Sequence, residues 1–67
     1  MRNKSAIDEV ILMLCSLQVA ASLKLRFARS NNYDEESINI RRGALTQVNR
    51  SLEEAEAIKA ELEGVEL

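Results

Sequence analysis

The chain contains no histidine, proline or tryptophan, and it has one cysteine, one tyrosine and one phenylalanine. Without histidine, no serine–histidine or cysteine–histidine nucleophile pair can form, and a zinc site lacks ligands. The lone thiol of Cys15 cannot form a disulfide within the chain, and its apolar neighbours predict a buried filler. Gly43 and Gly64 are isolated, which excludes a glycine-rich phosphate loop. The sequence therefore predicts a non-enzymatic protein without cofactor or metal.

The length of 67 residues allows one small domain. A domain of this size buries only about 60% of its unfolded surface. Such domains usually need disulfides, a metal or a partner subunit for stability. Because the cysteine and histidine content excludes the first two, we expect association between subunits. A hydrophobic content of 46% and a net charge of -2 are not typical of a disordered chain.

An uncharged stretch from Val10 to Leu23 raises the question of a membrane span or a secretion signal. The stretch is shorter than the ~20 residues that a spanning helix needs. A secretion signal is the stronger rival, because basic residues precede the stretch and small residues lie within it. Asp8 and Glu9, however, lie where such a signal is normally basic or neutral. We therefore expect a cytoplasmic protein that does not contact a membrane.

Apolar residues recur at helical spacing in the first half of the chain, and no proline interrupts them. This pattern predicts a helix over about residues 5–30. Ser5 is the expected N-cap, with Asp8 as its capping partner. The apolar stripe of this helix comprises Ile7, Val10, Leu14, Leu17, Ala21, Leu25 and Ala28.

A break follows at Ser30-Asn31-Asn32, because serine and asparagine favour turn conformations. Asn32 and Glu35 have the spacing of a helix N-cap and its capping partner. A second helix is predicted over about residues 34–63, and Gly64 is expected to cap its end. The apolar stripe of this second helix comprises Ile38, Leu45, Val48, Leu52, Ala55, Ile58 and Leu62.

Two long helices joined by a turn at about residues 31–33 form an antiparallel hairpin, a single domain over residues 1–67. The two stripes agree on one register, because the paired residue numbers have a nearly constant sum. The expected pairs are Ala28 with Ile38, Ala21 with Leu45, Leu17 with Val48, Leu14 with Leu52, and Val10 with Ala55.

The first helix carries more apolar residues than the second can cover, and an uncovered apolar face marks an interface. We therefore predict an all-α antiparallel two-helix hairpin that assembles into a homo-oligomeric helical bundle. A four-helix homodimer is its simplest form. The expected interface residues are Val10, Met13, Leu14, Leu17 and Phe27.

Five basic residues are expected to converge near the turn of the hairpin, and none has a carboxylate three or four residues away on its own helix. Three interpretations are open. The side chains extend to water, they pair with the glutamate-rich end of another subunit, or they bind an anion such as phosphate, a nucleotide or nucleic acid. The five residues are Lys24, Arg26, Arg29, Arg41 and Arg42.

These features favour a small regulator or inhibitor that binds a macromolecular partner, either a protein or a nucleic acid. Such economy of size is typical of accessory proteins of phages and mobile elements. A pI near 5.1 and only two aromatic residues are unfavourable for nucleic-acid binding. One alternative is an oligomer that sequesters an anionic small ligand, such as a nucleotide, at the basic turn. Another is a purely structural assembly adaptor.

Overall fold

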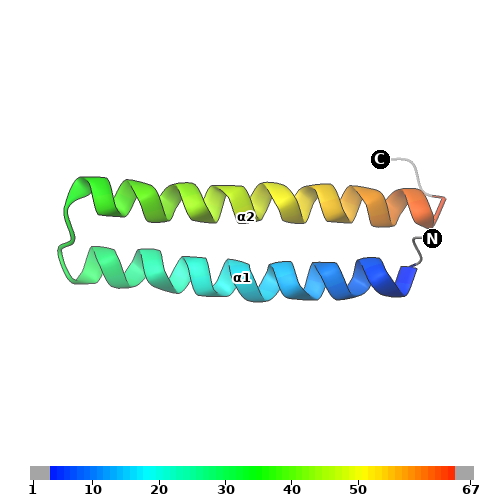
Figure 1. Cartoon of the computed structure of the whole chain (residues 1–67), viewed down its shortest axis with the longest axis horizontal. Coiled ribbons are helices and arrows are strands. Elements are labelled where there is room, and N and C mark those ends of the chain that lie inside the picture. The colour runs from blue at the N-terminus through cyan, green and yellow to red at the C-terminus, as the bar shows by residue number, and fades with distance from the viewer. Residues whose placement is uncertain (1–3, 65–67) are drawn as a thin grey trace.

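The computed structural model describes residues 4–64, which form two helices, α1 (Lys4–Ser30) and α2 (Glu35–Leu62). The helices lie side by side and antiparallel, so that the turn forms one end of a rod (Figure 1). The rod measures 46 × 19 × 16 Å. The predicted all-α hairpin is therefore confirmed.

The start of α1 differs from the expectation. Because the helix already includes Lys4, Ser5 lies within its first turn and the predicted N-cap at Ser5 is wrong. Asp8 has a different role from the predicted capping. Its carboxylate lies 3.0 Å from Nζ of Lys59 on α2, so it joins the two helices near the open end of the hairpin.

The turn caps both helices with backbone and side-chain hydrogen bonds. The N–H of Tyr33 donates to the carbonyl of Ala28 at 3.0 Å, which closes the end of α1. Asn32 adopts a left-handed conformation with φ of 55°, which asparagine tolerates better than most residues. Asn32 is therefore not the N-cap of α2. Asp34 is the N-cap, because its carboxylate accepts a hydrogen bond of 2.9 Å from the backbone N–H of Ser37.

The end of α2 follows the prediction for Gly64. This residue has φ of 75°, a left-handed conformation that costs glycine little. Its N–H donates to the carbonyl of Glu61 at 3.0 Å. A free helix carbonyl is thereby satisfied, and α2 ends at the expected place.

The face of α1 that packs on α2 follows a coiled-coil pattern, with steps of three and four residues. Within this pattern Ile11 and Gln18 replace the expected Val10 and Leu17, which are 43% and 52% exposed. Val10 and Leu17 therefore lie at the edge of the packed face, although Leu17 still lines a groove with its predicted partner Val48. The residues of this face, all buried or half-buried, are Ile7, Ile11, Leu14, Gln18, Ala21, Leu25 and Ala28.

Polar contacts between the helices show the register. Nε2 of Gln18 donates to Oδ1 of Asn49 across the interface at 2.6 Å, and Asp8 pairs with Lys59. Both pairs have residue numbers that sum to 67, within two of the sums expected from the apolar stripes. The helices therefore pair in the predicted register, but with a polar bridge near the middle of α1.

The hydrophobic core of the hairpin is thin. Among the described residues only Ile7, Leu25, Ala28 and Ala55 are buried apolar side chains, and none of the large ones is fully buried. The protein has an accessible surface of 5266 Å², whereas a compact monomer of this mass would expose roughly 4200 Å². The hairpin thus exposes about 1000 Å² more than a compact fold of the same size would.

Candidate interaction surfaces

One side of α1 carries a second stripe, which we call the outer stripe. Its members are again separated by three and four residues, so they share one side of the helix. Met13 and Phe27 are 66% and 58% exposed, and Val10 and Leu17 are exposed to a smaller extent. The outer stripe comprises Ala6, Val10, Met13, Leu17, Ala20, Lys24 and Phe27.

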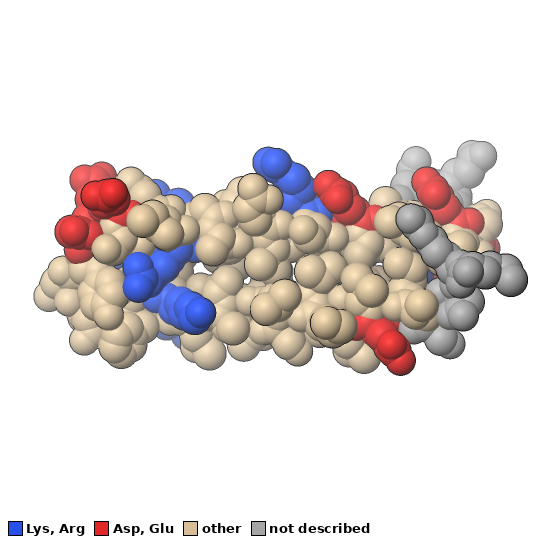
Figure 2. Space-filling view, viewed as in Figure 1, with Lys and Arg blue, Asp and Glu red and all other residues tan. Residues whose placement is uncertain are grey.

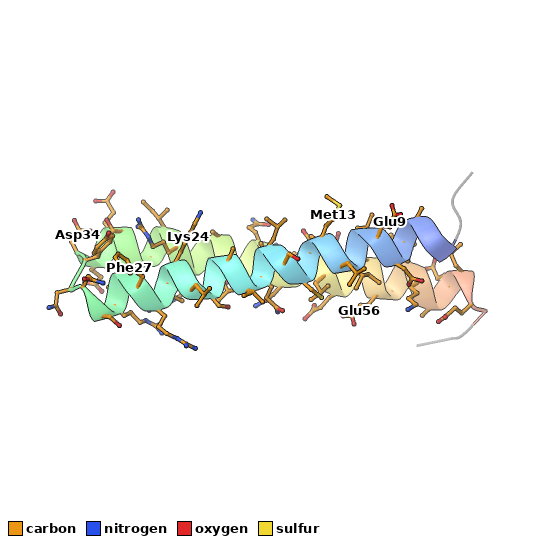
Figure 3. The ribbon with its side chains drawn as sticks, turned by 90° about the horizontal axis from the view of Figure 1, so that it is seen from below. Glu9, Met13, Lys24, Phe27, Asp34 and Glu56 are labelled. Carbon is orange, nitrogen blue, oxygen red and sulfur yellow. The ribbon has the colours of Figure 1, made fainter. Side chains whose placement is uncertain are left out.

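Four of the five predicted interface residues lie in the outer stripe. The fifth, Leu14, is half-buried and lies on the face that packs against α2. Glu9, Met13 and Lys24 project from the same side of α1, whereas Glu56 projects from the opposite side of the hairpin (Figure 3). The outer stripe is therefore an apolar band with one anion near its beginning and one cation near its end.

A groove between the helices extends the outer stripe onto α2. It encloses about 200 Å³, and small side chains such as Ala20 and Ala44 leave it open. The face drawn in Figure 2 is mostly uncharged, and the basic side chains visible between the helices lie near the turn. The groove is lined by Leu17, Ala20, Ala21 and Lys24 of α1 and by Arg41, Ala44 and Val48 of α2.

Arg41 is held in place at the turn end of this groove. Its guanidinium carbon lies 4.9 Å from the ring centroid of Tyr33, and Nη1 donates to the carbonyl of Ser37 at 3.1 Å. The Tyr33 ring also meets Phe27 edge to face, with centroids 6.0 Å apart. A cation over an aromatic face is attracted by the ring electrons. These contacts hold Arg41 in a half-buried position, and the sequence pattern did not reveal the contact of Arg41 with Tyr33.

The electrostatics of the turn also involve Asp34. Hydrogen bonding from the side chain and the backbone N–H of Ser37 lowers the pKa of Asp34 below its usual value of 3.8, and the nearby charge of Arg41 adds to this effect. Asp34 therefore stays ionised at neutral pH. The carboxylate favours the positive end of the α2 dipole and moderates the positive charge of the turn.

The five predicted basic residues do not share one surface. Lys24 and Arg41 line the groove beside the outer stripe, whereas Arg29 lines a hollow of about 230 Å³ with Leu45. Arg26 borders this hollow and also a wider depression of about 650 Å³, which Lys24 and Arg41 line as well. Nη1 of Arg42 donates to Oδ1 of Asn39 at 3.2 Å.

Arg26 and Arg29 are both exposed and border the hollow beside Leu45, and Arg26 also reaches the depression that Lys24 and Arg41 line. Within residues 4–64, neither forms an ion pair with a carboxylate. They are therefore available to a partner without the loss of an existing contact.

Other kinds of site have little support. Within residues 4–64 no group of three histidine, cysteine, aspartate or glutamate side chains could hold a metal ion. Cys15 is exposed rather than buried, so the expectation of a buried filler is wrong.

The segment Ala6–Ser30 of α1 is long and apolar enough to cross a membrane, with a mean hydropathy of 1.7. Secretion signals and the core helices of soluble proteins satisfy the same criteria. Only 6% of an 18-residue apolar window within this segment is buried inside the hairpin. α2 therefore leaves most of this window in contact with water or open to another cover.

Comparison with protein-family models, with curated proteins and with solved structures found no match to this chain.

Proposed function

We propose that this protein is a non-enzymatic regulator or inhibitor that assembles with itself into a helical bundle and binds a protein partner. The exposed apolar side of α1 carries this proposal. Met13, Leu17 and Phe27 are each more than half exposed, although they lie in one continuous stripe. A contiguous apolar surface of this kind is typical of an association site.

The partner surface is the pair Arg26 and Arg29 at the turn end. Both side chains are exposed, and both border one hollow that also includes Leu25 and Leu45. Two leucines beside two cations suit an acidic segment with an apolar anchor. A protein is the favoured partner, because the chain is acidic overall and has too few aromatic residues to stack several bases.

Affinity capture with two variants of the protein tests the partner surface. The variant Arg26→Gln with Arg29→Gln removes both charges, and Arg50→Gln removes an exposed charge from α2. We expect the wild-type protein and Arg50→Gln to recover the same proteins from the native host. The double variant should lose them while keeping its helical content in circular dichroism.

The outcomes of this capture separate the alternative functions. Equal recovery by the double variant, or no recovery by any bait, would contradict the proposed partner surface. Recovery that nuclease treatment removes would favour nucleic acid instead. Thermal shifts with inorganic phosphate or a nucleotide, lost in Lys24→Gln, would favour the sequestration of an anion.

A further inference from the structure

We propose that α1 pairs with α1 of a second copy in an antiparallel dimer whose two-fold axis passes beside Leu17. In this arrangement Lys24 of each subunit lies opposite Glu9 of the partner subunit. The inference rests on the self-association proposed above and adds the orientation, the centre and the ionic contacts of the interface.

Much of the outer stripe is complementary to its own reverse. An antiparallel copy centred on Leu17 places Met13 opposite Ala20 and Phe27 opposite Ala6, and it places Lys24 opposite Val10, next to Glu9. The Met13 and Phe27 pairs each combine a large side chain with a small one. Facing positions of alternating size let two helices interdigitate without voids. The symmetry of a two-fold interface requires this kind of self-complementarity.

Charge decides the orientation of the two copies. Glu9 and Lys24 project from the same side of α1, near opposite ends of the outer stripe (Figure 3). If both turns lay at the same end of the dimer, Lys24 and Arg41 of each copy would meet their counterparts and repel them. With the turns at opposite ends, each Lys24 approaches a carboxylate. Electrostatic complementarity therefore selects the antiparallel arrangement.

The exposed area is also appropriate for a dimer. The hairpin exposes 5266 Å², about 1000 Å² beyond a compact monomer of its mass. Each partner in a standard protein interface buries about 800 Å². One interface of ordinary size therefore accounts for most of the excess.

A lipid bilayer fits α1 less well than a second copy does. Insertion of α1 would separate Gln18 from Asn49 and Asp8 from Lys59, because α2 is too highly charged to enter the bilayer with it. Both polar groups of α1 would then lose their partners. A dimer through the outer stripe preserves both contacts, since they lie on other sides of the helix.

Disulfide cross-linking tests the centre and the direction of the interface. All variants carry Cys15→Ser, and one cysteine is introduced at a time. We expect Leu17→Cys to cross-link with itself, because this position lies beside the axis. Phe27→Cys alone should not cross-link, but a mixture of Met13→Cys and Ala20→Cys should form a mixed disulfide.

A charge exchange tests the ionic contact independently. Glu9→Lys alone and Lys24→Glu alone should each raise the dimer dissociation constant several-fold. The double variant, in which the two charges have changed places, should restore the dissociation constant. Additive weakening in the double variant would overturn the assignment of this contact.

Sedimentation of the same samples separates failure of the geometry from failure of the proposed function. An oligomer in which Phe27→Cys cross-links with itself, or Leu17→Cys does not, would overturn the antiparallel geometry and leave self-association intact. A monomer at all concentrations would contradict both. Binding of such a monomer to vesicles of phosphatidylcholine and phosphatidylglycerol would identify a lipid surface as the cover of α1.

Discussion

Asp34 fixes the beginning of α2 through its hydrogen bond with the N–H of Ser37. We predict that Asp34→Ala lowers the free energy of unfolding measured in urea, because the helix start loses its cap. Asp34→Asn should lower the free energy of unfolding by a smaller amount, since the amide oxygen still accepts the hydrogen bond. Equal stability of the alanine variant and the wild type would contradict this role.

The pKa of Asp34 gives the cap a pH dependence with a definite sign. Because the folded-state pKa is below the usual value of 3.8, ionised Asp34 stabilises the folded state above that value. This contribution is lost as the pH falls through the folded-state pKa. Stability measured from neutral to acidic pH should therefore fall less steeply in Asp34→Asn than in the wild type.

Lys59 gives the stability a pH dependence of the opposite sign, at alkaline pH. Its hydrogen bond and charge interaction with Asp8 raise its pKa above the usual 10.5, so the contribution to stability is present below that value. This contribution is lost as the pH rises through the raised pKa. We predict that Lys59→Gln shows a smaller alkaline loss of stability than the wild type. An identical alkaline profile would show that the Asp8 pair does not contribute.

The cap residues also show what sequence can predict for single positions. The break was predictable, because Ser30, Asn31 and Asn32 all favour turns. The capping residue was not, since Asn32 with Glu35 and Asp34 with Ser37 have the same spacing. The backbone selected Asp34 by placing Asn32 in a left-handed conformation.

Within α2, Gly43 is a helix-interior glycine with no heavy atom near the position of an added Cβ. We predict that Gly43→Ala stabilises the protein by about 1 kcal/mol, because alanine loses less backbone entropy in a helix. Gly64→Ala is the contrasting variant, since Gly64 has positive φ and alanine would be strained there. The temperature of thermal unfolding should rise for Gly43→Ala and fall for Gly64→Ala. Destabilisation by Gly43→Ala would indicate a close contact at this position.

The face of α1 that meets α2 shows a limit of apolar patterning. Because Leu17 is more hydrophobic than Gln18, the sequence pattern predicts that Leu17 rather than Gln18 faces α2. In the structure Gln18 faces α2 and bonds Asn49, while Leu17 points outward. Because α1 is apolar on adjacent sides, its own pattern does not decide which side meets α2. The two stripes together still gave the register, and the polar pair was visible only in three dimensions.

The two helices form a rod (Figure 1). The core between them is thin, and an apolar band along α1 is uncovered. Near the turn, Lys24 and Arg41 line the groove beside that band, and Arg26 and Arg29 border a separate hollow with Leu45. One surface thus suits a second copy of the chain, and the other suits a different partner. The sequence predicted the apolar excess correctly, whereas the contact of Arg41 with the Tyr33 ring was visible only in three dimensions.

Sedimentation equilibrium of three proteins tests the central claim, self-association through the outer stripe, most directly. Leu17→Lys places a charge at the centre of the stripe, and Val19→Lys places one at a similarly exposed apolar position on another side of α1. We predict a dimer mass for the wild type and for Val19→Lys, and a monomer mass for Leu17→Lys at the same concentrations. A monomeric wild type, or a Leu17→Lys variant that dimerises as well as Val19→Lys, would contradict the account.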